Sequence, residues 1–223
     1  MKIFSIVLSC VLSVCVAAIL GVYFWLDYGL WSIAVDVAMV LALPVASLLH
    51  EAGHMLFGAF VKIKAVPNFK IWGSSSCKLI PKTDKNLGSK VVFTAFGGAT
   101  MNLLFIILAV VAVYVDALPI CLALFAPASL YLFIFNTIPV QLDEGKTDGL
   151  VIADILSDDD EAKVMLAVLG VQAKLLKEVK IEEIEKSELF DLPQIREDDP
   201  AFIAVTELRY KYLEAVGESE DAE

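Results

Sequence analysis

The chain has few histidines, no paired cysteines and fewer basic than acidic residues, and each of these features narrows the possible functions. Its four cysteines show no paired spacing, so neither a disulfide framework nor a cysteine-based zinc site is expected. We interpret them as small buried residues plus one loop thiol; they are Cys10, Cys15, Cys77 and Cys121. The net charge is −11, with the acidity concentrated after Leu150, which argues against nucleic-acid binding because phosphates are bound by basic side chains.

What the chain has in excess is apolar sequence. Hydrophobic residues make up 58% of it, and its mean hydropathy is +0.74. They gather in four long runs, at about residues 3–25, 31–60, 91–115 and 117–139. A transmembrane helix needs about 20 such residues. We therefore predict an α-helical polytopic membrane protein with about four transmembrane helices. The first run follows Met1-Lys2 as a signal peptide would, but its length and aromatic end favour a retained span.

The connection between the second and third runs is rich in lysine. Residues 61–90 carry seven lysines against one acidic residue, Asp84. By the positive-inside rule this loop is cytoplasmic, and with four spans both termini are cytoplasmic too. The opposite turns, near Asp27 and Asp116, contain no lysine, which agrees. We expect an integral, multi-pass protein, and the short chain favours a bacterial cell membrane over an organelle.

The lysine-rich loop also has the pattern of a small β-hairpin. Residues 61–66 alternate between apolar and polar, and residues 69–72 and 77–80 flank a Gly-Ser-Ser-Ser turn. Such a hairpin at the membrane surface is either a simple connector or an edge strand that pairs with an extended substrate.

The last third of the chain has a different character. Residues 150–223 contain no further span, show helical patterning with alternating charge, and hold acidic runs such as residues 158–160. We predict a helical cytoplasmic appendage, at residues 150–223, attached to a membrane-embedded core at residues 1–149. Its acidic surface is either simply solvated or a docking face for a basic partner.

The only two histidines lie in the second apolar run, where residues 50–54 read His-Glu-Ala-Gly-His. On a helix, His50 and His54 lie one turn apart on one face and can both reach a single Zn²⁺. Glu51 can then act as general base on a metal-bound water. Ionisable groups within a span are costly and indicate a functional site. Histidines that only join packed helices would leave the adjacent Glu51 unexplained.

Two later stretches add polar groups to the spans. Asn102 follows small residues in the third span, and its buried amide serves either an interhelical hydrogen bond or a contact with the site or substrate. The fourth span contains Asn136 and ends at Pro139, with carboxylates just beyond. The second span ends on the same side of the membrane, at Phe60. A returning carboxylate can therefore reach both histidines.

Three motifs, at residues 50–54, 98–102 and 136–149, resemble in type and order those of the site-2 protease family of intramembrane zinc metalloproteases. The resemblance covers about residues 31–150. The resemblance implies that His50 and His54 are zinc ligands and that Glu51 is catalytic. It also implies a third ligand from an aspartate-glycine pair that follows Asn-x-x-Pro. The substrate would be a transmembrane protein that unwinds and is cut near the cytoplasmic face.

The chain departs from this family at two places. Ala99 stands where the family usually has proline. Ungapped counting from Asn136 puts Glu144 in the position of the third ligand, with Asp143 just before it, whereas Asp148 keeps the intact Asp-Gly pair. We favour Asp148 over Glu144 and Asp143, because a helix begins there and a helix start holds a carboxylate well.

The resulting hypothesis is a zinc endopeptidase of regulated intramembrane proteolysis. It would hydrolyse transmembrane or membrane-associated proteins within the lipid bilayer, with Asn102 and Asn136 orienting the substrate or polarising its carbonyl. An inactive adaptor that binds transmembrane partners is the alternative, although it would have no need of Glu51. A metal transporter would need a polar path of further His, Asp or Glu through the spans, and no such path is visible in the sequence.

Overall fold

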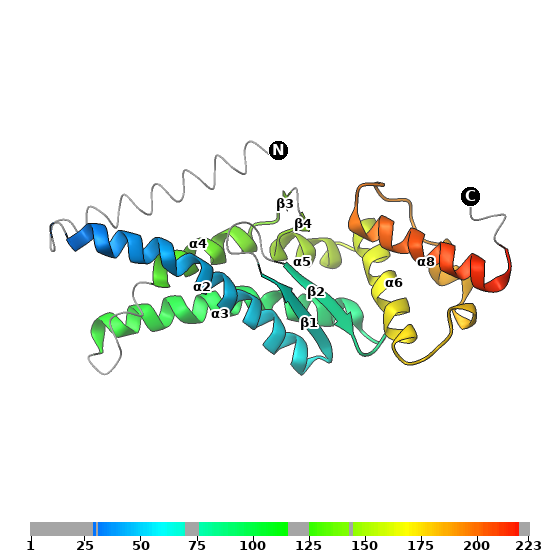
Figure 1. Cartoon of the computed structure of the whole chain (residues 1–223), viewed down its shortest axis with the longest axis horizontal. Helices are drawn as coiled ribbons and strands as arrows, with labels where there is room; N and C mark the ends of the chain where they lie inside the picture. The colour runs from blue at the N-terminus through cyan, green and yellow to red at the C-terminus, as the bar shows by residue number, and fades with distance from the viewer. Residues whose placement is uncertain (1–28, 30, 70–75, 116–124, 143–144, 219–223) are drawn as a thin grey trace.

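The structure is a computed structural model that describes residues 29, 31–69, 76–115, 125–142 and 145–218 (Figure 1). Within these ranges the chain is mostly helical, as predicted. One helix in the described part is long and apolar enough to cross a membrane, at Leu87–Ala112. It corresponds to the expected span at residues 91–115, whereas the helix at Trp31–Phe60 is not identified as a span over its described residues. The expected span at residues 3–25 lies outside the described residues, and so does the start of the one at 117–139. The multi-pass arrangement therefore stays a prediction.

Three helices form one end of the elongated molecule: α2 (Trp31–Phe60), α3 (Leu87–Tyr114) and α4 (Ala126–Thr137) (Figure 1). Helices α2 and α3 meet through glycine. A Cβ added to Gly53 would lie 2.3 Å from the carbonyl oxygen of Gly97, and one added to Gly97 would lie 2.4 Å from that of Gly53. Helix α4 packs on α2 through small residues such as Ala46 and Ala128. Small side chains thus bring the three backbones close together.

The predicted hairpin is confirmed. Strands β1 (Ile63–Asn68) and β2 (Ser76–Pro81) pair antiparallel, with Ile63 opposite Pro81 and Asn68 opposite Ser76. Ile63 and Ala65 are buried while the lysine between them is exposed, which is the alternation that a half-buried strand requires. The hairpin lies between the end of α2 and the C-terminal helices (Figure 1).

The segment after α4 is a tight, well-bonded turn. The short strands β3 (Gln141–Leu142) and β4 (Gly145–Lys146) pair antiparallel and lead into α5 (Asp148–Leu156). Thr147 caps α5 by accepting a hydrogen bond from the Leu150 N–H, and its hydroxyl donates to the carbonyl of Ile138 at 2.7 Å. A Cβ on Gly149 would lie 2.2 Å from the carbonyl oxygen of Thr137, so α5 begins directly against the end of α4.

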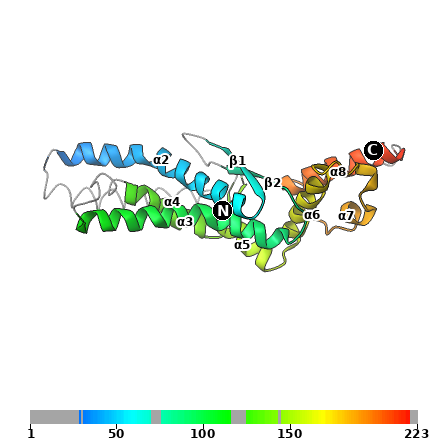
Figure 2. The same cartoon turned by 90° about the horizontal axis from the view of Figure 1, so that it is seen from below.

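The other end of the molecule is formed by residues 160–216, which we call the appendage from here on (Figure 2). Helix α5, which the predicted appendage includes, packs mainly against α3. The appendage contains α6 (Asp160–Leu175), the 3₁₀ turn η2 (Ile181–Glu183), α7 (Lys186–Phe190) and α8 (Pro200–Val216). These elements enclose an apolar core whose most buried members include Val171 and Leu189. A second cluster joins Leu169 of α6 to Ile63 of the hairpin and Val91 of α3. The appendage is therefore packed onto the rest of the chain rather than merely attached to it.

Candidate metal centre

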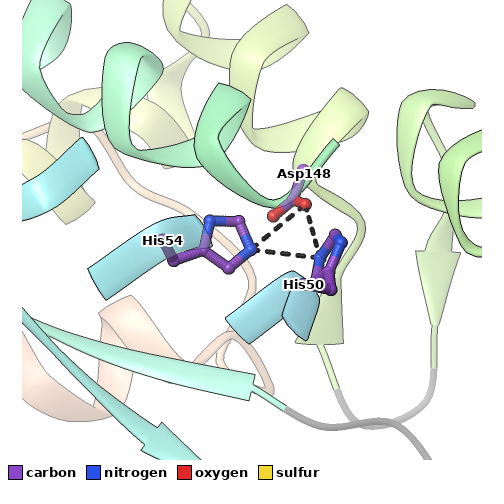
Figure 3. Close-up of side chains that lie close together, drawn as sticks. All are labelled: His50, His54 and Asp148. Carbon is purple, nitrogen blue, oxygen red and sulfur yellow. Dashed lines mark hydrogen bonds and ion pairs between the residues drawn. The ribbon is translucent and has the colours of Figure 1, made fainter. Parts of the chain in front are cut away.

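Helices α2 and α5 bring three ligand-type side chains to one point, as Figure 3 shows. The Nε2 atoms of His50 and His54 are 3.1 Å apart, and Oδ2 of Asp148 lies 3.1 Å from the first and 3.4 Å from the second. In a tetrahedral zinc site with bonds of about 2.0 Å, neighbouring ligand atoms are about 3.3 Å apart. Both histidines are buried. This group can therefore hold a metal ion.

Hydrogen bonds turn the Nε2 atom of each histidine toward this point. Nδ1 of His54 lies 2.9 Å from the carbonyl oxygen of Thr94. A carbonyl only accepts, so Nδ1 of His54 carries the proton and Nε2 of the neutral ring has its lone pair free. A hydrogen-bonded Nδ1 of this kind orients the imidazole ligands of most metal sites.

Asn102 contacts Nδ1 of His50 in the same way and orients its ring. Its Nδ2 lies 2.9 Å from Nδ1 of His50, and its Oδ1 is buried without a hydrogen-bond partner. Metal binding through Nε2 puts the proton of His50 on Nδ1, which then needs an acceptor. A 180° turn of the Asn102 amide supplies Oδ1 as that acceptor. The amide in the third predicted span thus reaches the site through His50, and a contact with substrate stays a prediction.

Room for the ion comes from a glycine. A Cβ added to Gly98 of α3 would lie 2.5 Å from Cε1 of His50 and 2.6 Å from the Nε2 atoms of both histidines. No side chain larger than hydrogen fits there without displacing the imidazoles. The site is therefore a cradle formed by two imidazoles, a carboxylate and a bare stretch of backbone, and these residues fit a bound metal.

The charge of Asp148 suits a cation. Burial alone would raise its pKa, but hydrogen bonds and positive charge from the facing imidazoles in their protonated form outweigh burial and lower the pKa to about 2. Asp148 is therefore ionised at neutral pH. Two imidazoles and one carboxylate make three protein ligands, the number found in catalytic zinc sites, whereas structural zinc sites have four.

Glu51 lies beside this group on α2 and is only 3% exposed. Its Oε2 accepts a hydrogen bond of 2.8 Å from the thiol of Cys77, which projects from β2. Burial, and then the Glu51 carboxylate, raise the pKa of Cys77 well above its ordinary value. The thiol is thus a neutral donor, and it keeps a buried carboxylate from being unpaired.

The remaining predicted residues are placed differently. Asn136 donates to the carbonyl of Leu132, one turn earlier in α4, at 3.0 Å, so its amide serves its own helix. Asp143 and Glu144, the other candidates for the third ligand, lie outside the described residues. Among the residues that the structure describes, Asp148 is the carboxylate that joins the two histidines.

Three contributors to the site were not assigned from the sequence. Gly98 belongs to the motif of small residues that ends at Asn102, but its closeness to the imidazoles is not predicted; Thr94 belongs to no motif, and Cys77 is predicted only as a loop thiol. The Gly-Gly pair at residues 97–98 carried the signal for the first, since two adjacent glycines serve two different neighbours. Nothing local marks the other two, because they reach the site only through the packing of α3 and the hairpin on α2.

In comparisons with protein-family models, with curated proteins and with solved structures, the chain matches none of them. The kinship with site-2 proteases therefore remains a hypothesis. It depends on the three motifs and on the arrangement of side chains described above.

Proposed function

We propose that the protein is an intramembrane zinc metalloprotease that hydrolyses peptide bonds of transmembrane or membrane-associated proteins. The observation that carries this proposal is the convergence of His50, His54 and Asp148, with their ligand atoms 3.1–3.4 Å apart. Glu51, the next residue after His50, is buried as well. Imidazole and carboxylate in a small tetrahedral group are the donor set of catalytic zinc.

The surface of the helical end supports a bilayer as its surroundings. Large apolar side chains are exposed along α3, with Leu104 at 46%, Ile107 at 50% and Val110 at 52%. The same holds on α2, where Leu41 is 62% exposed and Leu48 50% exposed. A continuous apolar surface of this kind is unfavourable in water and favourable in lipid. It supports a multi-pass protein whose site lies between helices, near the cytoplasmic loop that carries the hairpin.

Each residue has a definite task in this function. His50, His54 and Asp148 would hold the zinc ion, which when bound activates water and polarises the scissile carbonyl. Glu51 accepts the proton of the attacking water on Oε2 and delivers it to the leaving amine. Cys77 donates to that same oxygen, and the carboxylate keeps further lone pairs that can accept from the water. Asn102 keeps the ring of His50 in its ligating orientation.

Cleavage of single-span model substrates by the wild type and by Glu51→Gln tests the proposal. The amide keeps the size of the side chain and leaves the three ligands in place, but it cannot accept the proton. We expect cleavage by the wild type, none by Glu51→Gln, and equal zinc content in both. If both proteins hold zinc and capture the peptides without cutting them, the protein is a binding protein instead.

A further inference from the structure

Lys146 lies two residues before the ligand Asp148 and makes two short ion pairs. Its Nζ is 2.8 Å from Oδ2 of Asp154 and 2.5 Å from Oε2 of Glu161. The side chain of Lys146 is 17% exposed, and those of its partners are 18% and 24% exposed. Partly buried pairs of this kind are screened much less by salt than pairs on the open surface.

The two partners belong to different parts of the fold. Asp154 lies on α5, the helix that Asp148 begins, whereas Glu161 lies in the first turn of α6, in the appendage. The other oxygen of Glu161 accepts from Nε of Arg196 at 3.2 Å. One lysine therefore connects the strand before the metal ligand to the helix that carries the ligand and to the appendage.

The other hydrogen bonds of the turn before Asp148 join it to the end of α4, not to the appendage. Thr147 donates to the carbonyl of Ile138 and accepts from the N–H of Val140, so it fixes the turn to the end of α4. Neither bond sets the position of the turn relative to α6. Apolar contacts of Val151 and Ile155 with the cluster around Leu169 hold α5 and α6 together but are not directional. Lys146 adds a directional side-chain contact to the backbone hydrogen bond that the Asp159 N–H donates to the Asp154 carbonyl where α5 leads into α6.

We propose that Lys146 is a positioning residue that holds Asp148 in its ligating place by fastening β4 to α5 and, through Glu161, to the appendage. The inference rests on the proposed metal site. Metal geometry is sensitive to shifts of about 0.5 Å in a ligand, and supports around a ligand commonly change metal affinity about 10- to 100-fold. The appendage is then part of the support of the metal centre, although none of its side chains is a ligand.

The experiment compares the zinc affinity of five forms of the full-length protein in detergent, by competition with a chromophoric chelator: the wild type, three single variants and one double variant. Lys146→Met keeps the long stem and removes the charge, and Glu161→Gln removes one partner with little change of shape. Lys163→Met is the matched control, because this lysine also pairs with a carboxylate on α6 but its side chain is 41% exposed. The double variant combines Lys146→Met with Glu161→Gln, and the thermal unfolding of each metal-free form is recorded in parallel.

We expect Lys146→Met to lose about 10-fold in zinc affinity, Glu161→Gln to lose less, and Lys163→Met to match the wild type. In the double variant, Glu161→Gln should add little to Lys146→Met, because both changes break one connection. A role in stability alone would lower the unfolding temperature of the metal-free form and leave zinc affinity unchanged, which would overturn the proposal. Affinity of Lys146→Met equal to that of Lys163→Met would overturn it as well.

Failure of this inference and failure of the proposed function give different results. If the wild type binds no zinc, the metal site itself is wrong and both fall. If it binds zinc but cuts no substrate, the protease assignment falls, while the affinity comparison still decides the role of Lys146. If Lys146→Met does not fold, the comparison of Glu161→Gln with Lys163→Met decides it.

Discussion

The two ends of the molecule differ in which side chains they bury and which they expose. At the end formed by α2, α3 and α4, the interior holds His50, Glu51 and Asn102, each at most 5% exposed, while large apolar side chains face outward. In the appendage, Val171 and Leu189 are at most 1% exposed, and charged side chains such as Lys180 and Asp198 lie outside.

This contrast shows that burial by itself does not identify a core. In the appendage, apolar burial drives folding in water. In a bilayer the apolar face needs no burial, so close packing of small residues and hydrogen-bonded polar groups hold the helices together. The polar interior of the first region is then available for chemistry. The following predictions test this division, from the largest expected effect to the smallest.

Gly98→Ala should weaken metal binding severely. The new methyl would lie 2.6 Å from both Nε2 atoms, in the space that the ion requires, so a loss in zinc affinity of about 100-fold or more is expected. Gly88→Ala on the same helix is the control, because its Cβ would meet only the side-chain ends of Ile155 and Leu166, at 3.3 and 3.6 Å. Zinc content of the purified proteins measures the effect. Gly98→Ala with full zinc content would show that the ion does not lie among these three ligands.

Leu189→Ala should destabilise the appendage strongly. Leu189 is 1% exposed within its apolar core, and removal of a buried leucine side chain costs about 2–5 kcal/mol of unfolding free energy. Leu176→Ala is the control, since Leu176 is 60% exposed and the cost should be below about 0.5 kcal/mol. Hydrogen exchange of α6 to α8 in the full chain is the measurement. Equal protection in the two variants would contradict the view that burial of apolar side chains away from water stabilises this region.

Leu104→Lys and Ile203→Lys test whether the surface of α3 faces lipid and that of α8 faces water. Leu104 is 46% exposed on α3, and Ile203 is 61% exposed on α8. A lysine near the centre of a membrane helix costs about 2.5–3.5 kcal/mol on insertion scales, whereas one on a water-facing helix is nearly neutral. We expect only Leu104→Lys to reduce the fraction of protein recovered in membranes. Normal membrane recovery of Leu104→Lys would mean that α3 does not face lipid.

Sequence alone reached the parts of this molecule that depend on local patterns. The i, i+4 spacing placed His50 and His54 together, the alternation at residues 61–66 indicated β1, and the Asp-Gly pair at a helix start favoured Asp148. The contribution of Gly98 could not be read in this way, because it depends on which helix packs against α2 and at what height. The same applies to Lys146 and Glu161, which are 15 residues apart and meet only because α6 folds back on the turn. Short-range periodicity determines the elements, whereas contacts between elements determine the environment of the site.

The thiol of Cys77 gives the smallest and most local test. The thiolate is the form that reacts with maleimide, and burial together with the neighbouring Glu51 raises the pKa of Cys77, so little thiolate is present at neutral pH. Glu51→Gln removes the negative neighbour, which lowers this pKa toward its ordinary value. With alanine replacing the other cysteines (Cys10, Cys15 and Cys121), we expect faster maleimide labelling in Glu51→Gln at pH 7 and a rise in rate with pH that begins earlier. Lys64→Gln on the exposed side of β1 should label like the wild type. Identical labelling rates in Glu51→Gln and wild type would mean that Cys77 of the hairpin does not contact Glu51. The polar interior would then be formed by α2, α3 and α5 without the hairpin.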